Sequence, residues 1–135
     1  PVIDCFALRF DTPNHSIVMS ADTCYFPPLA EFASGADVLV HEALLSAGID
    51  TLVKRLNGGQ GLRDHLMAGH TMVEDVGRIA TAANVGHLIL NHLVPADDLT
   101  FTTADWQSAI FPTWKGRMTV ATDGLSIPLA PESLS

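Results

Sequence analysis

Short apolar runs, rich in β-branched residues, recur along the chain and predict the strands of a sheet. The first two runs flank Asp11-Thr12-Pro13-Asn14-His15, a segment with turn-forming residues, so they predict a β-hairpin. Two central runs are compact and apolar, as expected for buried strands. Two final runs flank Thr122-Asp123-Gly124 and predict a second hairpin. The predicted strands are residues 3–10, 17–20, 37–41, 88–90, 117–120 and 125–129.

Apolar residues spaced three and four positions apart predict helices between these strands. The clearest helix covers residues 71–83, with Glu74 and Asp75 in its first turn, where acidic side chains complement the helix dipole. Asn57-Gly58-Gly59-Gln60-Gly61 lacks the residue order of a phosphate-binding loop and predicts a surface loop. The other predicted helices run from Pro27-Pro28 to Gly35, over residues 43–56, and over residues 103–110 with Thr103 as the N-cap.

Strands and helices alternate in this order, which is typical of parallel βαβ units and of the α/β class. Right-handed crossovers place the carboxyl ends of parallel strands on one edge of the sheet. The chain has 135 residues, 47% of them apolar, which fits a single domain over residues 1–135 with a filled core. Because Pro1 leads directly into a strand pattern, we interpret the chain as a piece of a longer one.

Charge and hydropathy narrow the classes of partner. Seven basic and 15 acidic residues give a net charge of −8, and such a surface repels nucleic-acid phosphates. No apolar run reaches the roughly 18–20 residues that span a bilayer, so we expect no membrane partner and a cytoplasmic protein. Cys5 and Cys24 form no CxxC pair and are interpreted as thiols packed like small apolar groups.

Polar residues follow three of the apolar runs, at the edge where open α/β sheets bind ligands. Asp22, His41 and His92 each come after such a run, and His70 lies in the turn that opens the clearest helix. These side chains are predicted to reach one edge of the sheet. Carboxylates and imidazoles suit zinc, manganese or iron, and a carboxylate can bridge two cations about 3.5–4 Å apart in dinuclear hydrolases.

Structural roles remain an alternative for the histidines and tryptophans. His41 precedes Glu42, and adjacent strand residues point to opposite faces, so His41 supports the fold if Glu42 faces the site. Either tryptophan could instead line a substrate pocket. The side chains interpreted as structural, exposed or packing residues are His15, His65, His87, Trp106 and Trp114.

Four motifs, in this order and at these separations, carry a resemblance to a known family. They are Ser20-Ala21-Asp22-Thr23, His41-Glu42-Ala43, Gly69-His70-Thr71 and Leu90-Asn91-His92-Leu93-Val94-Pro95. The chain resembles the C-terminal half of a metallo-β-lactamase-fold hydrolase of the ribonuclease Z and arylsulfatase-like branch, over about residues 3–129. The resemblance implies one αβ half plus the closing strands of an αββα sandwich.

The resemblance also implies roles for four residues. Asp22 matches the aspartate that bridges two metal ions, and His92 matches a histidine that ligates one of them. Glu42 and His70 match a catalytic pair that positions and shuttles a proton near the leaving group. A carboxylate that accepts from one ring nitrogen fixes the tautomer and leaves the other nitrogen facing the substrate.

The chain departs from the family pattern before Asp22. The HxHxDH motif and the further histidine that precedes the aspartate motif are both missing. A catalytic zinc usually has three protein ligands, so Asp22 and His92 form only half of a site. The complete site is expected to hold two divalent metal ions, with zinc preferred over manganese and iron.

We therefore expect the parent protein to be a metal-dependent hydrolase in which a metal-held hydroxide cleaves an ester, sulfate ester or phosphodiester of a small molecule. RNA is disfavoured by the acidic charge and by Leu93-Val94-Pro95, which replaces an arginine-bearing continuation. The alternative is a catalytically inactive association domain, because half a sandwich leaves an apolar sheet face uncovered. The missing N-terminal half or a second copy of the chain would cover that face, and the isolated chain is expected to be inactive.

Overall fold

A computed structural model describes residues 4–96, 98 and 100–129 as a mixed α/β fold, which confirms the predicted fold class. Within these residues five strands form one sheet. The strands are β1 (Leu8–Asp11), β2 (Ser16–Met19), β3 (Val38–Leu44), β4 (His87–Val94) and β5 (Arg117–Val120). The helices are α1 (Leu29–Phe32), α2 (Ser46–Arg55), α3 (Gly59–Gly69), α4 (Val73–Ala83) and α5 (Thr103–Ile110).

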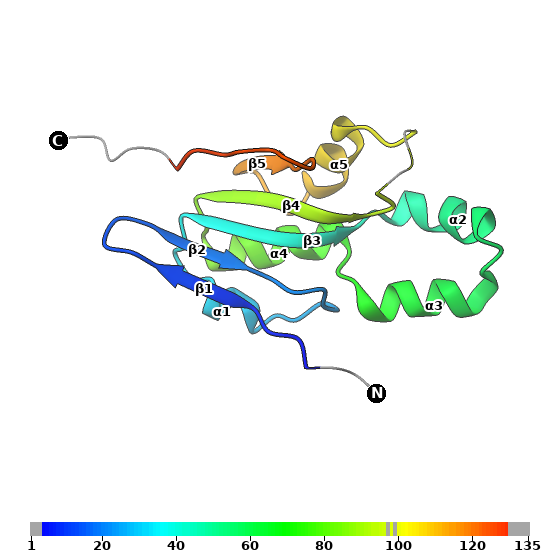
Figure 1. Ribbon diagram of the computed structural model, residues 1–135, viewed down its shortest axis with the longest axis horizontal. Coiled ribbons are helices and arrows are strands. Elements are labelled where there is room, and N and C mark those ends of the chain that lie inside the picture. Colours follow the sequence, from blue (N-terminus) through cyan, green and yellow to red (C-terminus); the bar gives the residue numbers. More distant parts are fainter. Residues whose placement is uncertain (1–3, 97, 99, 130–135) are drawn as a thin grey trace.

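The strands lie side by side in chain order, from β1 to β5 (Figure 1). β1 and β2 pair antiparallel as the predicted hairpin, and the other neighbours pair parallel. The parallel pairs confirm the predicted βαβ arrangement, with α1 between β2 and β3 and α5 between β4 and β5. The carboxyl ends of β2, β3, β4 and β5 therefore share one edge of the sheet.

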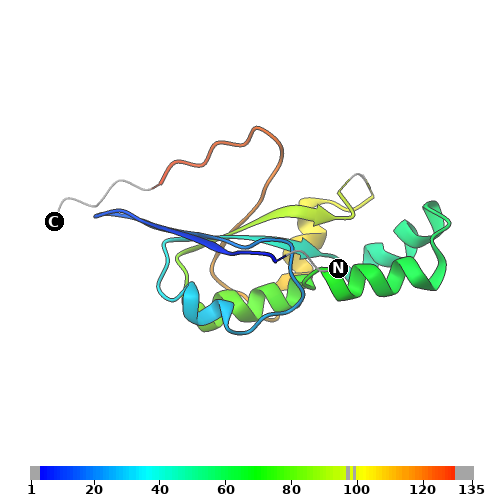
Figure 2. The ribbon, with the colours of Figure 1, turned by 60° about the horizontal axis from the view of Figure 1, so that its bottom comes forward.

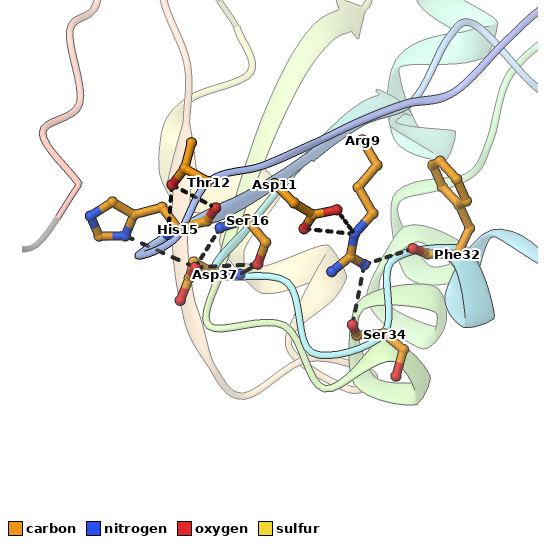
Figure 3. Close-up of polar contacts among 8 residues, drawn as sticks. All are labelled: Arg9, Asp11, Thr12, His15, Ser16, Phe32, Ser34 and Asp37. Atoms are coloured by element: carbon orange, nitrogen blue, oxygen red, sulfur yellow. Dashed lines mark hydrogen bonds and ion pairs between the residues drawn. The ribbon is translucent and has the colours of Figure 1, made fainter.

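Polar contacts fasten the hairpin to the rest of the fold (Figure 3). The Arg9 guanidinium donates to the backbone carbonyl of Phe32, the last residue of α1, at 2.8 Å and to that of Ser34 at 3.3 Å. At the start of β2, the backbone N–H of Ser16 donates to the Asp37 carboxylate at 2.7 Å. These contacts hold the hairpin against α1 and the start of β2 against the residue before β3.

One helical layer covers one face of the sheet. The predicted stripe of α4 is buried throughout, and it packs with α1, α5 and the inward residues of β3 and β4. In α1 only part of the predicted apolar face is buried, because Leu29 faces the core while Phe32 is half exposed. Figure 2 shows α1 and α4 on one side of the sheet, with the segment after β5 on the other side.

The opposite face of the sheet carries exposed apolar side chains. Val18 is buried in the core, so its neighbours Ile17 and Met19 point to the other face. Leu8 pairs with Met19 and lies on that same face, where it is 53% exposed. The predicted uncovered apolar face is therefore present among the described residues, and we call it the open face.

Two segments differ from the sequence prediction of loops and helices. Residues 57–61 are not a loop throughout, since α3 begins at Gly59. Only the turn itself needs unusual backbone, with positive φ at Asn57 and Gly59. Residues 43 and 44 belong to β3 rather than to the following helix, because they continue the pairing with β4 beyond His41.

The strand predictions fail at both ends of the sheet. β1 begins at Leu8, because its partner β2 ends at Met19 opposite it, and Ile3 lies outside the described residues. Residues 125–129 form an irregular segment after the turn at 123–124 rather than the second strand of a hairpin. Pro128 has no N–H to donate to a ladder, which disfavours a strand there.

Two smaller predictions are also wrong. The N-cap of α5 is Thr102, one residue before the predicted Thr103. Cys5 and Cys24 are exposed rather than packed, because they lie in irregular segments before β1 and after Asp22. As for the membrane, no helix within the described ranges combines the length and the apolar character that crossing a bilayer requires.

Candidate active site

The four predicted site residues lie at the carboxyl edge of the parallel strands. Asp22 follows the end of β2, Glu42 lies in the second half of β3, and His92 lies in the second half of β4. His70 occupies the turn between α3 and α4. The structure links all four side chains through direct contacts, so residues up to 70 positions apart in the chain form one cluster.

Glu42 is the buried centre of this cluster, with 1% of its surface exposed. Its Oε1 accepts a hydrogen bond from the Thr71 backbone N–H at 2.6 Å, and its Oε2 lies 3.1 Å from His70 Nδ1. Burial raises the pKa of the Glu42 carboxyl above its ordinary value, while the Thr71 amide and the His70 ring act in the opposite direction. The position of the carboxyl is therefore fixed on both oxygens.

Side chains also hold the backbone of Glu42. Its N–H donates to Ser20 Oγ at 3.2 Å, on the side of β3 that faces β2. Its carbonyl accepts from His41 Nδ1 at 2.6 Å. β2 ends at Met19, so the N–H and the carbonyl of Glu42 have no backbone partner on β2. The side chains of Ser20 and His41 form these two hydrogen bonds instead.

His70 presents its two ring nitrogens to different surroundings. Nδ1 donates to the Glu42 carboxylate, which keeps the proton of the neutral ring on Nδ1. Nε2 is then the nitrogen that can accept a proton. The ring stacks against the His92 ring, with centroids 5.6 Å apart and planes inclined by 23°. This arrangement matches a carboxylate-oriented imidazole that can accept or release a proton at Nε2.

Asp22 and His92 form a second, more exposed pair. Asp22 Oδ2 lies 3.3 Å from His92 Nε2, and the two side chains are 54% and 53% exposed. Both groups therefore face the solvent side of the cluster, in front of the buried Glu42. A carboxylate and an imidazole nitrogen at this separation are donors of the kind that divalent cations bind.

A β-bulge places His92 in this pair. Glu42 is paired with Asn91 and Ala43 with Leu93, so His92 is the extra residue of β4. Its φ of +38° lies in the left-handed region, which a residue with a side chain rarely adopts. The bulge turns the imidazole out of the sheet toward Asp22, and such backbone strain is commonly found at functional sites.

The other histidine rings do not join the four-residue cluster, although His41 lies beside Glu42 and its Nδ1 donates to the Glu42 carbonyl. His41 is fully buried, and burial lowers the pKa of the ring. His87 donates or accepts at Thr119 Oγ1 at 2.9 Å, and His15 lies near Asp37 at the far end of β2. His65 is exposed on α3. The structure agrees with the structural or exposed interpretation of these four residues.

The described residues do not complete a metal site. Apart from Asp22 and His92, no third His, Cys, Asp or Glu side chain among them comes close enough to share a cation. The donor set is therefore right in kind but short of the three protein ligands that a catalytic zinc usually has. Any further His, Cys, Asp or Glu ligand would come from outside the residues described.

A cavity of about 760 Å³ opens beside His92. α2 comes close to Pro95 because Gly48 has no side chain, and this brings Leu52 into the cavity wall. Both tryptophans belong to the hydrophobic core, but only Trp106 lines the cavity, and Trp114 donates to the Arg117 carbonyl at 3.3 Å. The cavity thus gives one of the two tryptophans the pocket position that the sequence left open.

Sequence reasoning assigned no role to several residues of the cluster. Thr71 donates its N–H to Glu42, and its hydroxyl donates to the Thr23 carbonyl at 2.6 Å. Ser20 supports the Glu42 backbone. Ser20, Thr23 and Thr71 all lie inside the motifs that contain Asp22 and His70. Their membership of these motifs was the one sequence feature that could have pointed to them.

Comparison with known proteins gives relatives in sequence. A protein named "Probable metallo-hydrolase YhfI" from Bacillus subtilis is 31% identical over 91 residues, which are 67% of this chain and 32% of that protein. Ribonuclease Z of Mycobacterium tuberculosis is 28% identical over 123 residues, 91% of this chain and 42% of the relative. Ribonuclease Z of Picrophilus torridus is 35% identical over 80 residues, 59% of this chain and 22% of the relative. No family model matches the chain.

A solved structure shares the fold. The crystal structure of the metallo-β-lactamase fold protein YhfI from Bacillus subtilis superposes with a TM-score of 0.68 at 24% identity, over 91% of this chain and 43% of that one. The chain therefore spans under half the length of this solved relative and of the three sequence relatives above.

Proposed function

We propose, for a chain that belongs to the metallo-β-lactamase-fold proteins and is similar to ribonucleases Z, that its parent is a metal-dependent hydrolase and that this chain carries half of the active site. The single domain of residues 1–135 would then be the C-terminal part of the parent's fold. The observation that carries the proposal is the pairing of Glu42 with His70 directly behind Asp22 and His92.

Asp22 and His92 would hold metal from this chain's side of the site. For a carboxylate and imidazole donor set zinc would be preferred over manganese or iron, and Asp22 and His92 are the residues that would hold it. The remaining ligands would come from the part of the parent outside this chain. A divalent cation bound there supplies the activation of the attacking water.

His70 and Glu42 would handle the proton of the leaving group. Glu42 keeps the proton of His70 on Nδ1, so Nε2 is the nitrogen that can receive a proton and pass it to the departing oxygen. The 15% exposure of the His70 side chain leaves the ring accessible from the site while Glu42 stays buried. Orientation of an imidazole by a buried carboxylate is a common arrangement in acid–base catalysis.

The substrate would be a small molecule with an ester, sulfate ester or phosphodiester bond. The names of the relatives favour the phosphodiester among these three, and they favour RNA more than the sequence alone does. Against RNA stands the net charge of −8, because binding to a phosphate backbone depends on lysine and arginine. We therefore keep the small phosphodiester or ester as the proposed substrate.

Two substitutions in the parent protein test this assignment. Asp22→Ala should lower the metal content, because it removes a proposed ligand. His70→Ala should leave the metal content unchanged and lower turnover about 100-fold or more, the usual scale of general acid–base catalysis. His65→Ala, a histidine exposed on α3, is the matched control and should change neither quantity. Loss of metal in His70→Ala would show that His70 is misassigned.

A second candidate function is association without catalysis. The observation that favours it is the open face, where Leu8 and Phe10 on β1 are more than half exposed. A second copy of the chain on this face would make a homo-oligomer, whereas the missing N-terminal half would complete a sandwich. A metal-free and inactive parent protein would favour this candidate over the hydrolase.

A further inference from the structure

Asp22 lies in an irregular segment, shortly after β2 ends at Met19. Its side chain is 54% exposed and approaches His92 Nε2 at 3.3 Å. A half-exposed carboxylate on such a segment has little packing around it to restrict its position. The place of the Asp22 carboxylate therefore depends on what holds the backbone before and after it.

Before Asp22, the chain is tied to β3 through Ser20. The Ser20 backbone N–H donates to the Val40 carbonyl at 2.9 Å, which extends the pairing of β2 with β3 by one hydrogen bond. The Ser20 hydroxyl accepts from the Glu42 N–H at 3.2 Å. The first side of the segment is thus fixed by the sheet itself.

After Asp22, the backbone of Thr23 is held by two groups that are distant in the chain. Its carbonyl accepts a hydrogen bond from Thr71 Oγ1 at 2.6 Å. Its N–H donates to Glu42 Oε1 over a longer distance of 3.5 Å. The short bond from Thr71 is therefore the stronger of the two contacts on this side of Asp22.

Thr71 is itself rigidly placed, because it is fully buried and all its polar groups have partners. Its N–H donates to Glu42 Oε1 at 2.6 Å, and its carbonyl accepts from the Leu44 N–H at 2.8 Å. Both of these bonds lead to β3, whereas the hydroxyl bond leads to Thr23. The hydroxyl can therefore be removed without breaking the contacts of Thr71 to β3.

We infer that the Thr71 hydroxyl is a positioning group for metal binding, because it holds the Thr23 carbonyl and thereby keeps the Asp22 carboxylate beside His92. The inference rests on the proposed hydrolase function and deepens it, since it adds a residue that affects the metal site without being a ligand. Groups that orient a metal ligand from behind commonly change the metal affinity by about 10–100-fold when they are removed.

Thr71→Val in the parent protein tests this role, because valine keeps the shape and the N–H and loses only the hydroxyl. The affinity for Zn²⁺, measured by competition with a chromophoric chelator, should fall about tenfold. Thr113→Val is the matched control, since Thr113 Oγ1 also donates to a backbone carbonyl, that of Ile110 at 3.0 Å, in the turn between α5 and β5. It should keep the affinity. An unchanged affinity in Thr71→Val, or an equal fall in both variants, would overturn the inference.

A second pair of variants separates the hydroxyl from the space that it fills. Thr71→Ser and Thr71→Ala differ only in the hydroxyl oxygen. Thr71→Ser should retain the Zn²⁺ affinity of the unsubstituted parent, and Thr71→Ala should lose it to the same extent as Thr71→Val. Equal affinities of the serine and alanine variants would overturn the inference, and this pair decides the question even if Thr71→Val does not fold.

Amide hydrogen exchange tests the same contact in the metal-free parent. The Thr23 N–H should exchange about tenfold faster in Thr71→Val than in the unsubstituted protein, because the segment loses its strongest contact after Asp22. Thr113→Val should leave this rate unchanged. Unchanged exchange of the Thr23 N–H in Thr71→Val would overturn the inference. A parent that binds no Zn²⁺ in any form would refute the hydrolase proposal, and the exchange rate would then decide by itself whether Thr71 holds the segment.

Discussion

Glu42 is the most constrained residue of the site, because hydrogen-bond partners hold both its carboxylate oxygens and both its backbone groups, and three of these four partners come from other segments. Thr71 and His70 hold the carboxylate, while Ser20 and His41 hold the N–H and the carbonyl. β2 must end early to present Asp22, and the backbone hydrogen bonds that β3 loses there are replaced by side chains. The geometry of Asp22 and that of Glu42 are thus consequences of the same strand end.

His41 makes stability depend on pH. Its folded-state pKa is lowered from 6.5 by burial, so below about pH 6.5 the unfolded chain takes up a proton that the folded chain does not. The free energy of unfolding should fall as the pH falls from 6.5 toward 5, by up to about 1.4 kcal/mol per pH unit from this group. His41→Asn keeps a donor for the Glu42 carbonyl but does not titrate, so urea unfolding should show a shallower acid slope.

The matched control for this prediction is His65→Asn, since His65 is an exposed histidine on α3. Its acid slope should equal that of the unsubstituted protein. If His41→Asn kept the same slope as the control, the His41 ring would be protonated in the folded state. Its hydrogen bond to the Glu42 carbonyl would then not come from a neutral imidazole.

At the scale of elements, two neighbouring threonines have different roles at the start of α5, because Thr102 is the N-cap and Thr103 is the first helical residue. Thr102 and Asp105 form a capping box, in which the Asp105 carboxylate accepts from the Thr102 backbone N–H at 2.7 Å. Thr102→Ala should lower the free energy of unfolding by about 1 kcal/mol, the usual effect of losing an N-cap. Thr103→Ala, one residue further on, should change it by no more than about 0.5 kcal/mol. Equal effects in thermal or urea unfolding would contradict the cap assigned to Thr102.

The sequence predicted the elements whose signals are local. The alternating and compact runs located the strands β2, β3 and β4, and the spacing of Val73, Val76 and Ile79 located α4. The start of α3 was missed because the glycines at 58, 59 and 61 hid a helix whose apolar positions, Leu62 and Leu66, are few. The predicted strand at 125–129 failed because turn residues alone do not decide whether a strand finds a partner.

The site was predictable in its members and not in its geometry. Motif order pointed to Asp22, Glu42, His70 and His92, and the structure brings these side chains together. The bulge at His92 depends on the register between β3 and β4, which no single segment encodes. The cavity beside His92 is lined by residues of α2, α5 and β5 as well as β4, so no single segment encodes it.

At the scale of the whole molecule, the open face and the incomplete metal site point the same way. One helical layer covers one face of the sheet, and the other face exposes Leu8, Phe10 and Met19. The described residues also supply only two candidate metal ligands, Asp22 and His92. Both deficits would be met by a second layer that covers the open face and brings further ligands to the carboxyl edge.

Leucine-to-lysine substitutions test whether the parent covers the open face. Leu8 lies on that face and is 53% exposed in this chain, while Leu56 in the α2–α3 turn is 58% exposed. In the parent, Leu8→Lys should lower the free energy of unfolding by about 2 kcal/mol or more, because it buries a charge. Leu56→Lys should change it by about 0.5 kcal/mol or less.

Equal effects of these two substitutions on urea unfolding would mean that the open face stays exposed in the parent. The native mass of the isolated chain then separates the remaining cases. A dimer that Leu8→Lys dissociates would identify a second copy as the partner on the open face. A monomer would refute association through this face.

The most direct test of the central claim compares the 135-residue chain with the full parent protein. Metal content and hydrolysis of carboxyl, sulfate and phosphodiester substrates should be measured on both under the same conditions. The parent should bind divalent metal and hydrolyse at least one substrate class, whereas the chain alone should bind metal weakly and be inactive, because Asp22 and His92 are only part of the ligand set. Strong activity of the isolated chain, or a metal-free and inactive parent, would contradict the account.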